Sequence, residues 1–175
     1  MNLTAAGLLA TAISLWLLIT VAVWYVGPWM KRQPLATALS APLWLHAGRH
    51  IALQVFSAQR FGFTIPDRLA REIAWGDVAG AALALTALWL LRCRSRAALA
   101  LIWLFVVESA VDLANAALMG SREMAFDSAH AVTWLILTFY APALWVSLAL
   151  LVWQLVVRQS EGVTAAPSLP AEIGP

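Results

Sequence analysis

The chain has 175 residues, of which 62% are hydrophobic and 11% are charged, and its net charge is +2. A soluble domain of this size has too little interior to bury so much apolar surface. The sequence therefore predicts an integral membrane protein of the all-α class, a polytopic transmembrane helix bundle whose first partner is the lipid bilayer. The small net charge gives no reason to expect nucleic acid as a partner. The single cysteine, Cys93, excludes an intrachain disulfide and a CxxC metal site.

Four apolar segments are long enough to span a membrane, which takes about 20 residues. They are residues 3–26, 72–91, 97–119 and 134–157. Basic residues close several of them, as in GPWMKR after the first and RCRSR after the second. The first segment lacks the basic start and short apolar core of a cleavable signal peptide, so we interpret it as a span. Pro142 lies inside the last segment and is expected to kink it.

A fifth segment, residues 35–57, is long enough to span but carries polar groups. On a helix these groups share one face: His46, Arg49, His50, Gln54 and Ser57. An interfacial helix usually has a broad charged face, whereas this one has a narrow stripe on an apolar cylinder. The pattern favours five spans, and four if the segment lies in the membrane interface instead.

Five spans divide the basic residues unequally between the two membrane faces. One face receives Lys31, Arg32, Arg92, Arg94, Arg96 and Arg158; the other receives Arg60, Arg68, Arg71 and Arg122. The positive-inside rule places the first face in the cytoplasm. Lys31 is the only lysine, and this bias toward Arg, with the heavy use of Ala and Leu, indicates a bacterial source, so we expect a multi-pass protein of the cell inner membrane. Residues 1–158 would form the helical bundle, and the polar, proline-bearing residues 159–175 a disordered tail.

A second polar stripe lies on the span that follows Cys93. Glu108, Asp112 and Asn115 are spaced i, i+4 and i+7 on one helix face. Glu108 is at the midpoint of its span, where a carboxylate is costly without a partner or water. With a rise of about 1.5 Å per residue, His46 is expected level with Glu108, and His50 level with Asp112.

Further polar residues extend this group toward one leaflet. Asp77 enters from that side, and Asp127 and His130 lie near that surface, where Asp127 is also placed to cap the last helix. The polar groups would then form a funnel from mid-membrane toward one face. Gly76 and Gly80 would permit close helix approach beside Asp77.

The first function that fits this funnel is a pocket for a small amphiphilic ligand or cofactor. Its predicted binding residues are His46, Arg49, His50, Asp77, Glu108, Asp112, Asn115 and His130. Arg49 would clamp a carboxylate or phosphate of the ligand. Haem is one option, and it would need an axial histidine pair, for example His46 or His50 with His130.

A membrane enzyme is the second candidate. His50, Glu108 and Asp112 are the catalytic candidates, since a histidine and a buried carboxylate can move a proton within a lipid-type substrate, as isomerases do. A divalent metal held by His46, His50, Glu108 and Asp112 would instead give a metal-dependent oxidoreductase. The fixed charge of Arg49 counts against a cation there.

The third candidate is an accessory membrane subunit whose buried charges are structural. Arg49 would pair with Asp112 or Glu108, because buried charges need partners. A homo-oligomer or a larger membrane complex stays open as an alternative in all three cases.

The stretches AWGDVAG, LIWLFVVESAVDLANA and FYAPALWVSLALLVWQL resemble a group of small bacterial integral-membrane proteins without an assigned function. In that group a Gly-Asp pair opens one span, an Asp-Leu pair lies late in the next, and a proline lies inside the last. Asp77, Asp112 and Pro142 match that pattern, and the resemblance covers about residues 40–155. It implies the topology of the bundle and nothing about activity.

Overall fold

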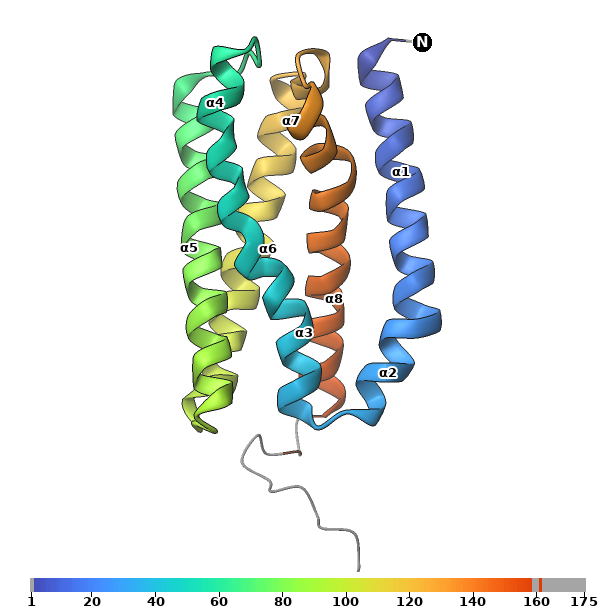
Figure 1. Ribbon diagram of the computed structural model, residues 1–175, viewed down its shortest axis with the longest axis vertical. Coiled ribbons are helices and arrows are strands. Elements are labelled where there is room, and N and C mark those ends of the chain that lie inside the picture. Colours follow the sequence, from blue (N-terminus) through green and yellow to red (C-terminus); the bar gives the residue numbers. More distant parts are fainter. Residues whose placement is uncertain (1, 159–160, 162–175) are drawn as a thin grey trace, which may run out of the picture.

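Five helical rods run along the long axis of the molecule in the computed structural model, which describes residues 2–158 and 161 (Figure 1). The described residues contain no strand, so the expected all-α class is confirmed. Four of the rods are long and apolar enough to cross a membrane: Leu3–Arg32, Asp67–Arg92, Ala97–Arg122 and Ala131–Val157. These are the features of a membrane protein.

Three of the rods are composite, and two are single α-helices. The first consists of α1 (Leu3–Val21), the π-helical η1 (Ala22–Val26) and α2 (Gly27–Arg32). The second consists of α3 (Leu35–Ala47), the 3₁₀-helical η2 (Gly48–Gln54) and α4 (Val55–Arg60). The single helices are α5 (Asp67–Arg92) and α6 (Ala97–Arg122). After η3 (Ala125–Asp127), the last rod consists of α7 (Ala131–Leu135), the π-helical η4 (Ile136–Tyr140) and α8 (Ala141–Val157).

Prolines explain the π-helical turns in the first and last rods. Pro28 and Pro142 have no N–H to donate, and a proline ring clashes with the carbonyl four residues before it. In each rod a π-helical turn lies directly before the helix that contains the proline near its start. The wider turn accommodates the ring, and the rod continues. The distortion expected at Pro142 takes this form.

The rod with the polar stripe departs from the predicted regular helix. It tightens into a 3₁₀-helix over η2, six residues after Pro42, and a 3₁₀-helix has about three residues per turn. Side chains four residues apart therefore no longer share a face. His46 and Arg49 are fully buried, whereas His50 and Ser57 are exposed, so the prediction that all these residues share one face is wrong for His50 and Ser57. The rod nevertheless rises along the full height of the bundle beside α5 (Figure 1).

Two hydrophobic clusters fill the bundle. One packs α3 against α5, α6 and α8, with Leu39, Ala84, Ile102, Phe105 and Leu151 fully buried. The other packs α4 and the start of α5 against the connecting turns, with Val55, Phe63, Leu69, Ala74 and Ala125 buried. On η2 and α5 the polar residues lie between the residues of the two clusters in the sequence, and on α6 they lie near the end of the first cluster, which continues to Leu113. The bundle therefore carries a polar layer between two apolar ones.

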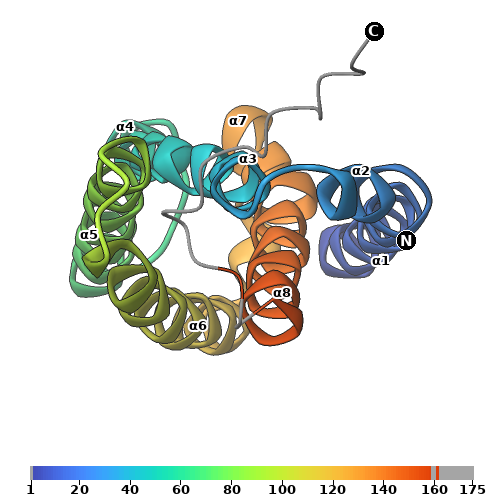
Figure 2. The same ribbon diagram turned by 90° about the horizontal axis from the view of Figure 1, so that it is seen from below.

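The first rod lies outside the rest of the bundle. Seen along the axis, α3 to α4, α5, α6 and α8 form a ring, and α1 lies beside α8 and η4 outside it (Figure 2). The side chains of α1 are mostly exposed, and its only buried residue is Gly7. The polar layer therefore belongs to the other four rods.

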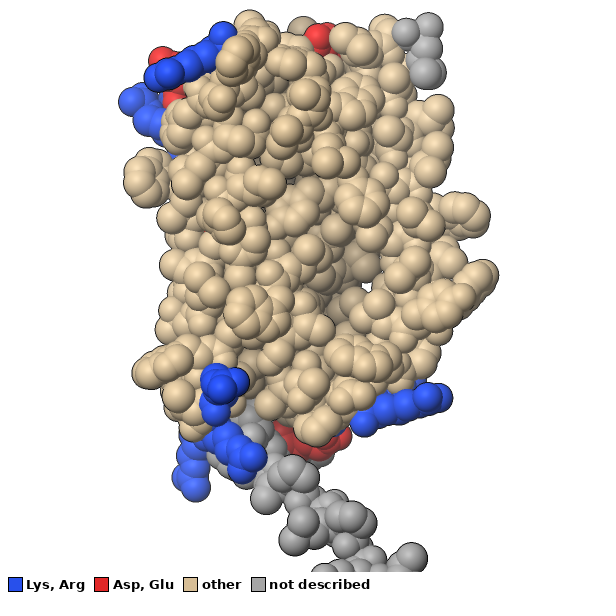
Figure 3. Space-filling model, in the orientation of Figure 1, with Lys and Arg blue, Asp and Glu red and all other residues tan. Residues whose placement is uncertain are grey.

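Charged side chains gather at the two ends of the bundle and leave a broad uncharged band between them (Figure 3). We call the end that carries the N-terminal start of α3 the basic end. Its basic residues are Lys31, Arg32, Arg92, Arg94, Arg96 and Arg158. We call the opposite end, where α4 joins α5, the loop end. Phe61 is exposed there, whereas Phe63 is buried in the second hydrophobic cluster.

Candidate functional site

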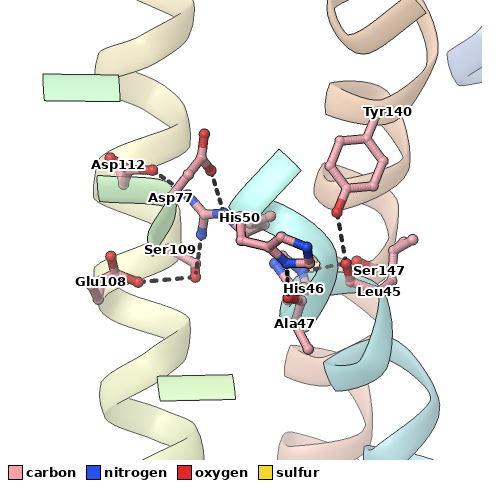
Figure 4. Close-up of polar contacts among 11 residues, drawn as sticks. Leu45, His46, Ala47, His50, Asp77, Glu108, Ser109, Asp112, Tyr140 and Ser147 are labelled. Carbon is pink, nitrogen blue, oxygen red and sulfur yellow. Dashed lines mark hydrogen bonds and ion pairs between the residues drawn. The ribbon is translucent and has the colours of Figure 1, made fainter. Parts of the chain in front are cut away.

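Arg49 is the centre of the polar layer, and its side chain is fully buried. Its Nε donates to Oδ1 of Asp77 at 2.6 Å, and its Nη1 donates to the Oγ of Ser109 at 2.9 Å. Its Nη2 donates to Oδ2 of Asp112. Figure 4 shows these acceptors converging from α5 and α6. All three nitrogens of the guanidinium are thus engaged, and one side chain from η2 ties α5 to α6.

Two glycines of α5 make this arrangement possible. A Cβ at Gly80 would lie 2.6 Å from Nη1 of Arg49, and a Cβ at Gly76 would overlap the Asp112 carboxylate. The sequence predicted that these glycines would allow close helix approach. In the structure the space they leave holds the side chains of Arg49 and Asp112.

Glu108 is the third carboxylate of the cluster. It is half-buried, and its Oε2 accepts a hydrogen bond from Ser109 at 3.1 Å. Ser109 therefore connects Glu108 to Arg49, as Figure 4 shows. With all groups ionised, Asp77, Glu108 and Asp112 carry three negative charges against one positive charge. Such an excess is unfavourable in a low-dielectric interior unless protons or a cation offset it.

The three carboxylates keep some access to their surroundings. The side chains of Asp77 and Asp112 are 15% and 19% exposed, whereas that of Arg49 is 0% exposed. Oxygens that do not bond to Arg49 can therefore meet another donor. The cluster has spare acceptor oxygens, whereas each nitrogen of its arginine already donates one hydrogen bond.

His46 lies in a separate group next to the cluster. Its Nε2 is 2.9 Å from the Oγ of Ser147, and its ring meets the ring of Phe105 edge-on at 5.0 Å between centroids. Nδ1 of His46 is buried and has no hydrogen-bond partner among the described residues. Close by, Tyr140 donates its hydroxyl proton to the carbonyl oxygen of Leu45 at 2.9 Å (Figure 4). His46 thus faces α8, not the carboxylates of α6.

Three of the residues predicted for the ligand site form no hydrogen bond with the side chains of the cluster. His50, Asn115 and His130 are all exposed. Nδ1 of His50 is 3.1 Å from the carbonyl oxygen of Ala47, in the preceding turn of its own rod. His130 begins α7 at the loop end. Sequence reasoning therefore placed Arg49, Asp77, Glu108 and Asp112 together as the structure does, but it also included these three.

The structure does not assemble the ligand sets considered for a cofactor. Across residues 2–158 no group of three or more His, Cys, Asp or Glu side chains is arranged to hold a metal ion. His46 contacts Ser147, while His50 is exposed, so they do not form a set with Glu108 and Asp112. A haem would need two converging histidines, and His130 is exposed at the loop end. The residues present fit neither group.

The sequence did not predict two hydrogen-bonding side chains of this region, Ser109 and Ser147. Ser109 bridges Arg49 and Glu108, and its position one turn from Asp112 on the same helix face was the available signal. Ser147 pairs with His46, and nothing in the surrounding apolar residues of α8 marked it.

Asp127 was expected to cap the last helix. Instead it accepts a hydrogen bond from Thr4 of α1, and His130 occupies the cap position.

The fold and this site together define a class: a helical membrane protein with an acidic ion-pair cluster inside its bundle. Residues 6–156 match the family described as "Domain of unknown function (DUF8737)". The match covers the whole polar layer, and the chain belongs to this family. No curated protein and no solved structure matches the chain. The function must therefore be argued from the site.

Proposed function

We propose that this protein is a multi-pass protein of a bacterial inner membrane that binds a small amphiphilic molecule at the Arg49 cluster. The cluster consists of Arg49, Asp77, Glu108, Ser109 and Asp112. The observation that carries the proposal is the imbalance of charge around Arg49: three carboxylates surround one guanidinium, and every nitrogen of that guanidinium is already engaged.

This imbalance changes the expected ligand. The sequence suggested that Arg49 clamps a carboxylate or a phosphate. An anionic head would have to reach a fully buried guanidinium, and it would add to the excess of negative charge. A cationic head with N–H donors does the opposite, since ammonium groups donate up to three hydrogen bonds and carboxylates accept them strongly. The ligand we propose is therefore an amphiphile with an ammonium-type head.

The membrane placement is supported by the four candidate spans and by the distribution of charge. The basic end carries six basic residues, and the positive-inside rule assigns that end to the cytoplasm. The use of Arg in place of Lys, together with an alanine-rich and leucine-rich composition, supports a bacterial source.

Binding of dodecylammonium tests the proposal directly. We would titrate it into the protein in nanodiscs of zwitterionic lipid, and compare wild type with Glu108→Gln. Gln keeps the shape of Glu and can still accept the Ser109 hydrogen bond, but it removes one negative charge. A hydrogen bond to a charged group contributes about 1.5 to 3 kcal/mol, so we expect the Kd to rise by about tenfold or more.

Glu123→Gln is the matched control, because Glu123 is an exposed carboxylate just beyond the end of the same helix. It should leave the affinity unchanged. Equal affinities of wild type and Glu108→Gln would contradict the proposal, as would tighter binding of dodecanoate than of dodecylammonium.

A structural network is the second candidate, and the full burial and full engagement of Arg49 favour it. In that case protons offset the excess negative charge, the cluster only ties α5 and α6 to η2, and dodecylammonium does not bind in the same titration.

A further inference from the structure

A cavity of about 330 Å³ lies at the basic end, away from the Arg49 cluster. It lies between α3, α6 and α8, and its lining residues are Leu35, Leu99, Trp103, Leu155 and Arg158. Four of the five are apolar or aromatic, and the fifth carries a guanidinium. A cavity with apolar walls and one cationic group suits a molecule with an apolar body and an anionic head.

Arg158 is held in place on one side by neutral acceptors. Its Nη1 donates to the carbonyl oxygens of Gln33 at 3.1 Å and Met30 at 3.4 Å, and to Oε1 of Gln154 at 3.2 Å. These bonds fix the end of α8 to the turn between α2 and α3. They use only one of the three nitrogens.

The Nε and Nη2 atoms, on the other edge of the Arg158 guanidinium, bind a carboxylate. Nε donates to Oε1 of Glu161 at 2.9 Å, and Nη2 donates to Oε2 of the same carboxylate. Two parallel N–H donors facing two oxygens form the fork that guanidinium groups offer to carboxylates and phosphates alike. The hydrogen bond from Arg158 lowers the pKa of Glu161, which keeps this carboxylate ionised at neutral pH. Its side chain is 50% exposed, so an ion pair of this kind exchanges readily with other anions.

We propose that this cavity binds the headgroup of an anionic phospholipid, whose phosphate replaces the Glu161 carboxylate on the Nε–Nη2 edge of Arg158. The acyl chains would lie against the apolar walls, and Trp103, which is partly exposed in the first turns of α6, suits the membrane interface. The proposal is independent of the Arg49 cluster.

Native mass spectrometry can test this site with defined lipids. The protein would be incubated in detergent with equal amounts of phosphatidylglycerol and phosphatidylcholine of the same chain length. Wild type should retain phosphatidylglycerol in preference. Arg158→Gln should reduce that retention by about tenfold or more, because it removes a charged hydrogen-bond fork. Arg96→Gln, which removes one charge from an exposed residue of the same end, is the control and should leave retention unchanged.

Glu161→Gln provides a second, opposite test that leaves Arg158 and its carbonyl contacts intact. Removing the competing carboxylate should increase phosphatidylglycerol retention roughly two- to fivefold, the range expected for a partly exposed ion pair. The proposal is overturned if the two lipids are retained equally, if Arg158→Gln behaves like Arg96→Gln, or if Glu161→Gln brings no gain. Competition by millimolar inorganic phosphate would also overturn it, since the site would then take free phosphate and not a lipid.

Discussion

Arg49 shows how one side chain can organise the interior of an apolar bundle. It is fully buried, and its three nitrogens bond to Asp77, Ser109 and Asp112. The sequence left Asp112 and Glu108 open as partners of Arg49, and the structure pairs Arg49 with Asp112 and with Asp77. It did not predict the exposed position of His50, since nothing in the local sequence marks the change from an α-helix to a 3₁₀-helix at residue 48.

Replacing Arg49 by Leu should strongly destabilise the protein. The change would leave the largely buried carboxylates of Asp77 and Asp112 without their cation, and breaking a buried pair costs about 3 to 5 kcal/mol. We expect a loss of that size in the free energy of unfolding, measured by denaturant titration in micelles. Adding Asp77→Asn and Asp112→Asn should recover part of it, because both uncompensated charges are then gone. Unchanged stability in Arg49→Leu would show that the ion pairs contribute nothing.

The contact between α5 and α6 depends on small residues. Gly76 and Gly80 lie one turn apart on α5, and both face the Arg49 cluster. Gly80 is buried, and a Cβ there would also come within 3.3 Å of Oε2 of Glu108. The sequence could identify these glycines as sites of close approach. It could not show that the approaching group is a guanidinium, because that depends on how η2 directs Arg49.

Gly80→Ala should lower the stability of the bundle. Arg49 cannot move away without breaking its bonds to Asp77 and Asp112, and overpacking of this kind costs about 1 to 3 kcal/mol. The better helix propensity of Ala returns at most about 1 kcal/mol. We therefore expect a net loss of about 1 to 2 kcal/mol in the free energy of unfolding.

Gly120→Ala, on α6, is the control for this substitution. The nearest atom to a Cβ at Gly120 would be the Cβ of Ala125 at 3.9 Å, an ordinary contact. Thermal unfolding in detergent should show no loss for Gly120→Ala and a lower midpoint for Gly80→Ala. Equal midpoints would contradict the packing described here.

At the scale of the whole molecule, composition determined most of what the sequence could predict. The length of the apolar segments predicted the four long rods, because hydropathy does not depend on how the helices pack against one another. The path of residues 35–60 was harder to predict, because polar residues and a 3₁₀-helix interrupt the apolar α-helix there. The buried position of Phe63 and the separate place of α1 depend on contacts between distant segments, which no local pattern encodes.

Cysteine labelling tests whether residues 35–60 cross the membrane. Cys93 is the only cysteine and is exposed, so Cys93→Ala gives a background without thiols. In that background we would introduce Lys31→Cys at the basic end or Phe61→Cys at the loop end. A membrane-impermeant maleimide added to intact cells should label Phe61→Cys and should label Lys31→Cys only after permeabilisation. Labelling of both from the same side would rule out this crossing.

Native mass spectrometry tests most directly whether the Arg49 cluster binds a cationic amphiphile. The protein would be extracted from the membrane in a mild detergent and measured with and without dodecylammonium. We expect one bound equivalent on the wild type, a marked loss of it in Glu108→Gln, and retention in Glu123→Gln. A bare polypeptide mass for the wild type under both conditions would contradict the claim, and it would leave the cluster as a structural network.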